Sequence, residues 1–359
     1  MDSDRFNVDE LKHILRDGSS AAKIDWGNEE HRRCVVACMV KGAYVLESDR
    51  ATMDRREELA PAWWESFGFH LENELREQKP PIFETIYGAI FKYAPCPRTP
   101  PHPRAPRYVV AFRGTMRKHP EWSVATQDIY LDFKILTNKL KKRTRSKLAY
   151  AAVDKLMDGE AGLGGDDVWL AGHSLGASLA LDVGRDMMER RELNLPTFLF
   201  NPPQVSLTAA MNLLNAQDVA KRHLHFTSYL FKAGAATVSG RHQKRMEKLF
   251  DRLSPWVPNL YLHEKDWICQ GFIDYFELRQ RFVDRFPCVA SKFMTLSYRD
   301  MLWRLLGKVK ERPHLLPSAM LWKTAQSSLN AHGLQQWWKP NAELGLGAGT
   351  RYSYPVPQA

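Results

Sequence analysis

The chain has 359 residues, of which 44% are hydrophobic, so it can bury the core of one large domain or two smaller ones and is not disordered by composition. Its formal net charge of +10 is compatible with binding nucleic acid or anionic lipid, or with simple solubility. The densest basic run, residues 139–147, lacks the interleaved aromatic residues of a nucleic-acid platform. We therefore expect no nucleic-acid partner and interpret this run as a solvated helix face.

The five cysteines form an odd and scattered set, which argues against a disulfide framework and for a reducing compartment. Cys34 and Cys38 are close in sequence but have no second Cys or His pair nearby, so we interpret them as buried thiols and expect no metal. The first residues are acidic and polar, unlike a secretory signal. No apolar run approaches the roughly 20 residues that cross a bilayer. We expect a cytoplasmic protein.

The N-terminal part of the chain is predicted to hold helices before any strand. Residues 1–30 form a polar segment, and residues 34–46 have the apolar and small residues of a buried helix. A further helix is expected to start near residue 60 and to end at Pro80 and Pro81. Residues 95–106 are rich in proline, which excludes a helix or an interior strand there.

Strands and helices then alternate along the chain. Short buried strands are predicted at residues 108–112, 168–172, 197–200 and 259–262, with helical stretches before residue 158 and at 175–189. Such alternation is typical of α/β proteins with a mainly parallel central sheet and helices on both faces. We expect a single domain over residues 31–339, with a core motif region at 107–205, a helical insertion at about 233–256 and a loose tail at 340–359.

The strand at 168–172 leads into Gly172-His173-Ser174-Leu175-Gly176. A serine hydroxyl is a poor nucleophile unless it lies on a tight turn, has a base as its partner and faces donors that hold the developing oxyanion. In a Gly-x-Ser-x-Gly sequence the two glycines let a strand and a helix approach closely around a strained serine. The motif therefore predicts Ser174 as the nucleophile of a serine hydrolase.

Two groups are expected to hold the oxyanion. One is the backbone N–H of Leu175, the residue after the nucleophile, and the other should come from a loop after an earlier strand. The loop Arg113-Gly114-Thr115 directly follows the strand at 108–112 and stands in the right place.

The sequence Ala111-Phe112-Arg113-Gly114-Thr115, followed about sixty residues later by Gly-His-Ser-Leu-Gly-Ala, resembles the class 3, or fungal-lipase-like, α/β-hydrolases. The close similarity covers roughly residues 107–205. With its segments 35–50 and 60–64, the chain is most similar to a plant branch often labelled GDSL esterase/lipases, although no Gly-Asp-Ser-Leu occurs in it. The resemblance implies an α/β-hydrolase fold without a cofactor, and an oxyanion donor at Thr115 through its backbone N–H and hydroxyl.

The acid of a catalytic triad should follow the serine in this fold, because the chain order is Ser, then Asp or Glu, then His. Asp266 follows the predicted strand at 259–262, in a position that resembles the family's Asn-x-x-Asp-x-Val turn, with Trp267 in place of the usual proline. We favour Asp266 as the acid; Glu264 and Asp274 are the alternatives.

The base is the hardest residue to assign, because six histidines follow the serine. His332 precedes a run of aromatic residues and resembles the final histidine of the family, so we favour it as the base. His314, which lies between two prolines, is the alternative.

These residues predict a serine carboxylic-ester hydrolase, a lipase or esterase, that cleaves an acyl lipid or related ester through an acyl-enzyme on Ser174. Two alternatives stay open: a catalytically silent lipase-like protein that binds or signals, and an acyltransferase with the same triad. Residues 115–132 and 241–250 are candidate lids, which would bring peripheral contact with a lipid surface.

Overall fold

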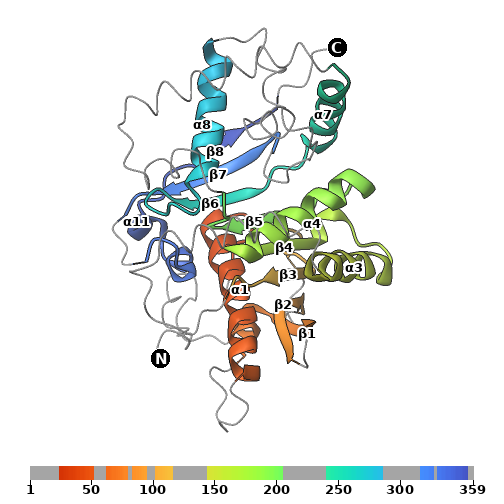
Figure 1. The fold of residues 1–359 in the computed structure, drawn as a ribbon. Helices are drawn as coiled ribbons and strands as arrows, with labels where there is room; N and C mark the ends of the chain where they lie inside the picture. The colour runs from red at the N-terminus through yellow and green to blue at the C-terminus, as the bar shows by residue number, and fades with distance from the viewer. Residues whose placement is uncertain are drawn as a thin grey trace.

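The computed structural model describes residues 24–51, 62–79, 83–94, 102–115, 144–204, 240–285, 316–326 and 330–354. In these parts of the chain, eight strands form one sheet and lie side by side in chain order (Figure 1). The strands are β1 (Phe69–Lys79), β2 (Phe83–Tyr93), β3 (Tyr108–Phe112), β4 (Val168–His173), β5 (Thr197–Phe200), β6 (Asn259–His263), β7 (Ala319–Thr324) and β8 (Thr350–Tyr352). The α-helices are α1 (Glu29–Ala51), α3 (Thr144–Gly159), α4 (Leu175–Arg191), α7 (Gly240–Leu253), α8 (Gln270–Arg285) and α11 (Asn341–Leu344), and the 3-10 helices are η3 (Trp63–Phe67), η5 (Gly165–Asp167) and η6 (Leu334–Trp338).

The sheet is parallel in its centre and antiparallel at both edges. From β3 to β7 each strand is parallel to the next, whereas β1 and β2, β2 and β3, and β7 and β8 are antiparallel pairs. Parallel neighbours need a long crossover connection, and α3, α4, α7 and α8 lie in the connections that follow β3, β4, β5 and β6. The α/β class predicted from the sequence is therefore confirmed, as a mixed sheet.

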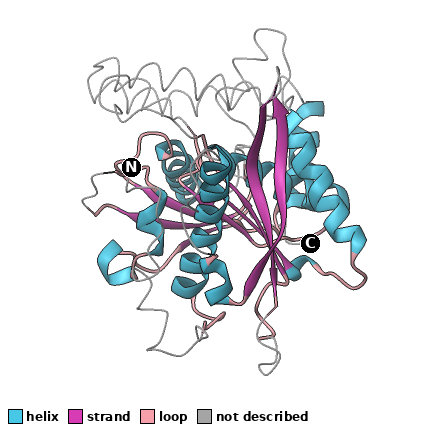
Figure 2. Ribbon diagram, turned by 90° about the horizontal axis from the view of Figure 1, so that it is seen from below, coloured by secondary structure: helices cyan, strands magenta, loops and turns pink. Residues whose placement is uncertain are grey.

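Helices cover both faces of this sheet (Figure 2). Alternate residues of a strand point to opposite faces. On β3, Val110 and Phe112 belong to a core that contains residues of α3, α4, α7 and α8, whereas Val109 and Ala111 belong to a second core that contains residues of α1 and η6. Every residue of β3 and β4 is buried, as expected for strands that lie between two layers of helices.

Residues 69–79 contradict one expectation. The sequence predicts a helix that ends at Pro80, but these residues form β1, which pairs antiparallel with β2. The Glu, Arg, Gln and Lys residues of this segment favour helices, and register shifts after Leu71 and Leu75 interrupt the alternation that marks a strand. Cross-strand pairs take the place of helical contacts; Arg76 Nη1, for example, lies 2.6 Å from Glu84 Oε2.

The C-terminal segment is more ordered than the sequence indicates. Within residues 340–354, α11 is followed by β8, which pairs antiparallel with β7. Tyr352 and Tyr354 are buried in the core that α3, α4, α7 and α8 share. The expected loose tail is therefore wrong over this part, because single aromatic residues anchor a segment too short to show an apolar period.

The predicted insertion at 233–256 is described from residue 240 onward. There α7 packs apolar side chains into the same core as α4, namely Met246, Leu249, Phe250 and Leu253. Residues 1–23 and, apart from Thr115, the candidate lid at 115–132 lie outside the described residues. None of the described helices is long and apolar enough to cross a membrane.

Candidate active site

Ser174 lies at a sharp turn between β4, which ends at His173, and α4, which begins at Leu175. Its backbone has φ 55° and ψ −125°, a conformation that a non-glycine residue rarely adopts. Hydrogen bonds hold this strained backbone: the Ser174 N–H donates to the Phe200 carbonyl at 2.9 Å, and the Ser174 carbonyl accepts from the Ala177 N–H at 2.9 Å. The turn therefore sets the serine at the carboxyl ends of the parallel strands.

The two glycines of the motif allow this turn because there is no room for a side chain at either position. A Cβ atom on Gly172 would lie 2.3 Å from the carbonyl oxygen of Gly176, and a Cβ atom on Gly176 would lie 2.2 Å from that of Phe112. Both distances are far inside van der Waals contact. The spacing of the motif thus reflects the close approach of β4, α4 and β3 around the serine.

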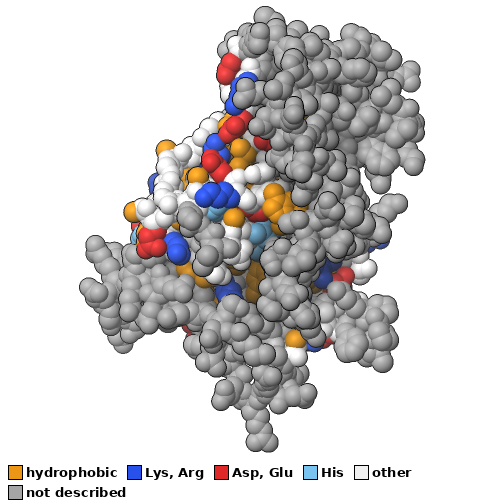
Figure 3. Space-filling model, turned by 60° about the vertical axis from the view of Figure 1, so that its left-hand side comes forward, with side chains coloured by type: hydrophobic (Ala, Val, Ile, Leu, Met, Phe, Trp, Pro, Cys, Tyr) orange, Lys and Arg blue, Asp and Glu red, His pale blue; other side chains and the backbone are white. Residues whose placement is uncertain are grey.

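Ser174, His332 and Asp266 form a continuous line of hydrogen bonds. The Nε2 atom of His332 lies 2.9 Å from Ser174 Oγ, and its Nδ1 atom lies 2.7 Å from Asp266 Oδ2. All three residues are buried, with exposed fractions of 4% for Ser174, 9% for His332 and 2% for Asp266. Figure 3 shows a face of the molecule on which histidine and hydrophobic side chains lie next to each other.

The carboxylate of Asp266 has several donors around it. Its Oδ2 atom also accepts from Asn201 Nδ2 at 2.7 Å, and its Oδ1 atom accepts from the Ile268 N–H at 3.1 Å. Burial alone raises the pKa of Asp266, but the neighbouring His332 and these hydrogen bonds outweigh burial, so the pKa is lowered from its usual value. The carboxylate is ionised at neutral pH and able to hold a proton donor at His332 Nδ1.

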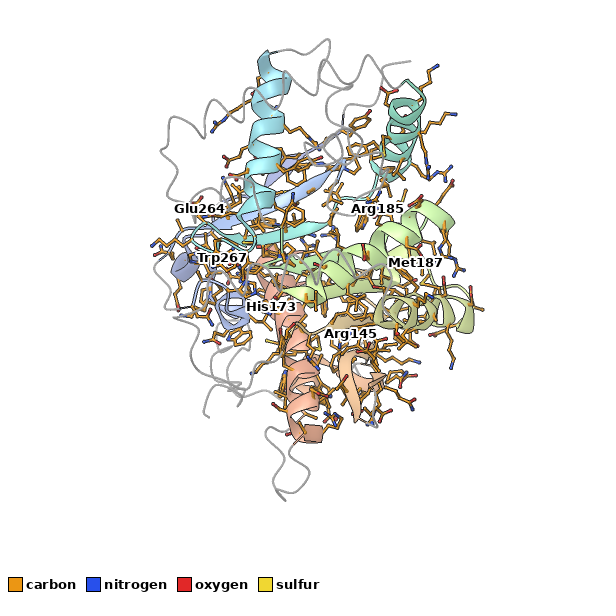
Figure 4. The ribbon with its side chains drawn as sticks, viewed as in Figure 1. Arg145, His173, Arg185, Met187, Glu264 and Trp267 are labelled. Atoms are coloured by element: carbon orange, nitrogen blue, oxygen red, sulfur yellow. The ribbon has the colours of Figure 1, made fainter. Side chains whose placement is uncertain are left out.

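The two alternative candidates for the acid, Glu264 and Asp274, lie close to Asp266 in sequence. Glu264 is exposed on the segment between β6 and α8 (Figure 4), and Asp274 lies on α8. The hydrogen bond to His332 favours Asp266 over both. His314, the alternative base, lies outside the described residues.

The loop with the expected oxyanion donor lies against the serine. A Cβ atom on Gly114 would lie 3.0 Å from Ser174 Cβ and 3.0 Å from the His173 carbonyl oxygen, so the loop backbone touches the turn. Thr115 follows Gly114 and is exposed. Leu175 is the first residue of α4, so its backbone N–H has no acceptor within the helix. One expected donor, Leu175, thus directly follows the serine, and the residue before the other, Gly114, touches the serine turn.

Comparison with known proteins identifies a relative of this chain. A GDSL esterase/lipase of Arabidopsis thaliana is 33% identical over 335 residues, which cover 88% of this chain and 91% of that protein. The chain belongs to the plant GDSL-like esterase/lipase family. No family model matches this GDSL-like chain, and no solved structure matches it.

Asn201 is a further residue of the candidate active site, and the sequence alone does not indicate its role. Its side chain donates to Asp266 Oδ2 at 2.7 Å and to the Ala331 carbonyl at 3.2 Å, and it accepts from Trp337 Nε1 at 2.5 Å. Asn201 has φ 46°, a left-handed conformation that asparagine tolerates better than most residues. An asparagine between a buried strand and two prolines is the signal that could have drawn attention to this position.

The described residues were also considered as possible ligands of a metal ion. In the parts of the chain that the structure describes, no group of three or more His, Cys, Asp or Glu side chains could hold a metal ion. Cys34, Cys38 and Cys269 are buried there and form no disulfide.

Proposed function

We propose that the chain is a serine carboxylic-ester hydrolase that cleaves an acyl lipid or a related ester. The observation that carries this proposal is the line of hydrogen bonds from Ser174 Oγ through His332 to Asp266, with distances of 2.9 and 2.7 Å. An ester as the substrate is supported by the family, since the Arabidopsis relative is named an esterase/lipase.

Each residue of the triad has a distinct chemical role in this proposal. His332 Nε2 takes the proton of Ser174 Oγ as the oxygen attacks the ester carbonyl, and returns the proton to the leaving alcohol. Asp266 fixes the histidine ring and stabilises the imidazolium that forms. Water then attacks the acyl-enzyme with His332 again as the base, which releases the acid and restores Ser174.

The negative charge of the tetrahedral intermediate needs donors that stand in place before the reaction. The backbone N–H of Leu175 is one such donor, at the positive end of the α4 dipole. Thr115, through its N–H and hydroxyl, is the other. The contact of the Gly114 backbone with Ser174 supports this role for the loop.

An α/β-hydrolase fold is part of the proposal. Three observations support it: the parallel centre of the sheet, the serine turn between a central strand and a helix, and the chain order serine, aspartate, histidine. Gating by lids and contact with a lipid surface remain predictions. Equal turnover of dissolved and micellar esters would count against them.

Turnover of a p-nitrophenyl ester tests the proposed function. The wild-type chain should hydrolyse the ester, and Ser174→Ala and His332→Ala should each reduce kcat by about 10³-fold or more. Ser174→Ala at full activity would exclude Ser174 as the nucleophile. A wild-type chain without activity toward short-chain and long-chain esters would exclude the hydrolase itself.

A further inference from the structure

We propose that Tyr44 and His173 are positioning residues. They hold the oxyanion loop, residues 113–115, and the base His332 at fixed places around Ser174. This inference rests on the proposed function, because it concerns the same site. It assigns a role to the residue before the nucleophile, and to a residue on a helix far from the motif in sequence.

A series of three hydrogen bonds connects the oxyanion loop with the backbone of His332. The Gly114 N–H donates to Tyr44 Oη at 2.8 Å, Tyr44 Oη lies 2.8 Å from His173 Nδ1, and His173 Nε2 lies 2.7 Å from the His332 carbonyl oxygen. One end of this series is the oxyanion loop, and the other end is the backbone of the base. His173, which is labelled in Figure 4, directly precedes Ser174, so this series of hydrogen bonds includes the neighbour of the nucleophile.

The direction of each hydrogen bond follows from the groups involved. A backbone carbonyl can only accept, so His173 Nε2 carries the proton that is donated to His332. The Nδ1 atom of a neutral ring then accepts, and the Tyr44 hydroxyl donates to it while one of its lone pairs accepts from the Gly114 N–H. Burial, with a smaller effect from His332, lowers the pKa of His173 to about 3, and burial raises the pKa of Tyr44 to about 12. Both side chains are thus neutral across the working pH range. Each of the three hydrogen bonds therefore keeps the same donor and the same acceptor.

A second contact from α1 restrains the same loop. Arg113 Nη1 donates to the Gly114 carbonyl at 2.7 Å and its Nε donates to the Ile86 carbonyl at 2.6 Å, while Glu47 Oε1 lies 3.5 Å from its Nη2. In a trans peptide the carbonyl and the following N–H point in opposite directions. Holding the Gly114 carbonyl on Arg113 therefore turns the Thr115 N–H away from Arg113.

The restraint on His332 acts close to its ring. The rings of His173 and His332 have centroids 5.1 Å apart, and the hydrogen bond from His173 fixes the backbone from which the His332 side chain extends. A shift of this backbone would change the 2.9 Å distance between His332 Nε2 and Ser174 Oγ. Small errors of placement are costly in catalysis, since displacement by about 1 Å can cost about 10²-fold in rate.

Tyr44→Phe tests the inference, because it removes only the hydroxyl. We expect kcat for p-nitrophenyl butyrate to fall about 10- to 100-fold, with KM changed less than about twofold. Tyr275→Phe is the matched control: it removes a hydroxyl that bonds to the Leu316 carbonyl at 3.1 Å, away from the site. It should leave kcat unchanged. Thermal unfolding of both variants separates a loss of folded protein from a loss of rate.

A second variant, His173→Gln, removes the ring in the middle of this series of hydrogen bonds. By itself it should lower kcat about 10- to 100-fold with KM changed less than about twofold, which keeps the test possible if Tyr44→Phe does not fold. Two residues that act through one series of hydrogen bonds should be non-additive, so the double variant should lose little more kcat than His173→Gln alone. Wild-type kcat in a folded Tyr44→Phe or His173→Gln variant, a fall matched by Tyr275→Phe, or full additivity would overturn the inference while the hydrolase stands. A wild type inactive toward esters would instead remove the proposed function on which it rests.

Discussion

Asp266 Oδ2 lies 2.7 Å from His332 Nδ1, and Asp266 is only 2% exposed. In the proposed mechanism, a buried carboxylate this close to an imidazole accepts a hydrogen bond from Nδ1–H, so that Nε2 is free to take the proton of Ser174. The lowered pKa of Asp266 shows that His332 and the surrounding donors outweigh burial and keep the carboxylate ionised. The charge of Asp266, and not only its shape, should therefore matter for the rate.

Asp266→Asn keeps the shape of the side chain and removes the charge. We expect kcat to fall about 10³- to 10⁴-fold with little change in KM, because an amide that donates to Nδ1 stabilises the wrong tautomer of His332. Asp274→Asn on α8 is the matched control and should retain activity, as should Glu264→Gln. Strong inactivation by either control, with an active Asp266→Asn variant, would move the acid elsewhere.

Asn201 should affect the rate through Asp266. Asn201→Gly removes the amide but tolerates φ 46°, so we expect a moderate fall in kcat from the loss of its hydrogen bond to Asp266. Asn201→Asp should be more harmful at pH 7, since a second carboxylate beside Asp266 raises the pKa of one of the two. Steady-state kinetics of the two variants give the comparison. An aspartate variant as active as the glycine variant would contradict this role.

Glu47 should make the stability depend on pH. Burial raises the pKa of Glu47, but the hydrogen bonds from Arg50 and the Ile86 N–H and the charge of Arg113 lower it more, so the folded pKa lies below the unfolded value. A lowered folded pKa stabilises the protein above the unfolded pKa, and this contribution is lost as the pH falls through the folded pKa.

Chemical denaturation between pH 6 and pH 3 measures this effect. The free energy of unfolding should fall more steeply toward acid in the wild type than in Glu47→Gln, which has no carboxylate to protonate. Glu72→Gln, a change at an exposed glutamate of β1, is the control and should follow the wild type. Parallel curves for the wild type and Glu47→Gln would show that Glu47 does not contribute in this way.

Gly176→Ala should disrupt the serine turn. Its Cβ atom would lie 2.2 Å from the Phe112 carbonyl oxygen, on backbone that cannot move without shifting β3. We expect a loss of about 1–3 kcal/mol in the free energy of unfolding, together with loss of activity. Gly159→Ala, at the end of α3, meets nothing within 4 Å and should unfold like the wild type. Equal stability of the two variants would contradict the close packing at the motif.

The sequence predicts best those features that depend on neighbouring residues. The strands at 108–112, 168–172, 197–200 and 259–262 are short apolar runs, and the structure has β3, β4, β5 and β6 there. The turn at Ser174 depends on two glycines within the motif. β1 was missed because its register shifts hide the alternation and its polar residues favour helices.

Features that depend on distant residues could not be predicted from the sequence. Tyr44 lies 70 residues from Gly114 and 129 from His173, so no local pattern connects the three. The hydrogen bonds of Asn201 to Asp266 and Trp337 likewise need the folded sheet. The sequence favours Asp266 and His332 because the chain order of the triad limits the choice and because their surroundings resemble those of the family's acid and base.

Labelling with a serine-reactive fluorophosphonate tests the central claim most directly, because it requires an activated serine and no knowledge of the substrate. We predict that the wild type gains one adduct, found on the peptide that contains Ser174. Ser174→Ala should gain none, and Ser178→Ala, a change one turn along α4, should be labelled like the wild type. A wild type that stays unlabelled, or a Ser174→Ala variant that is labelled as fast as the wild type, would contradict the account.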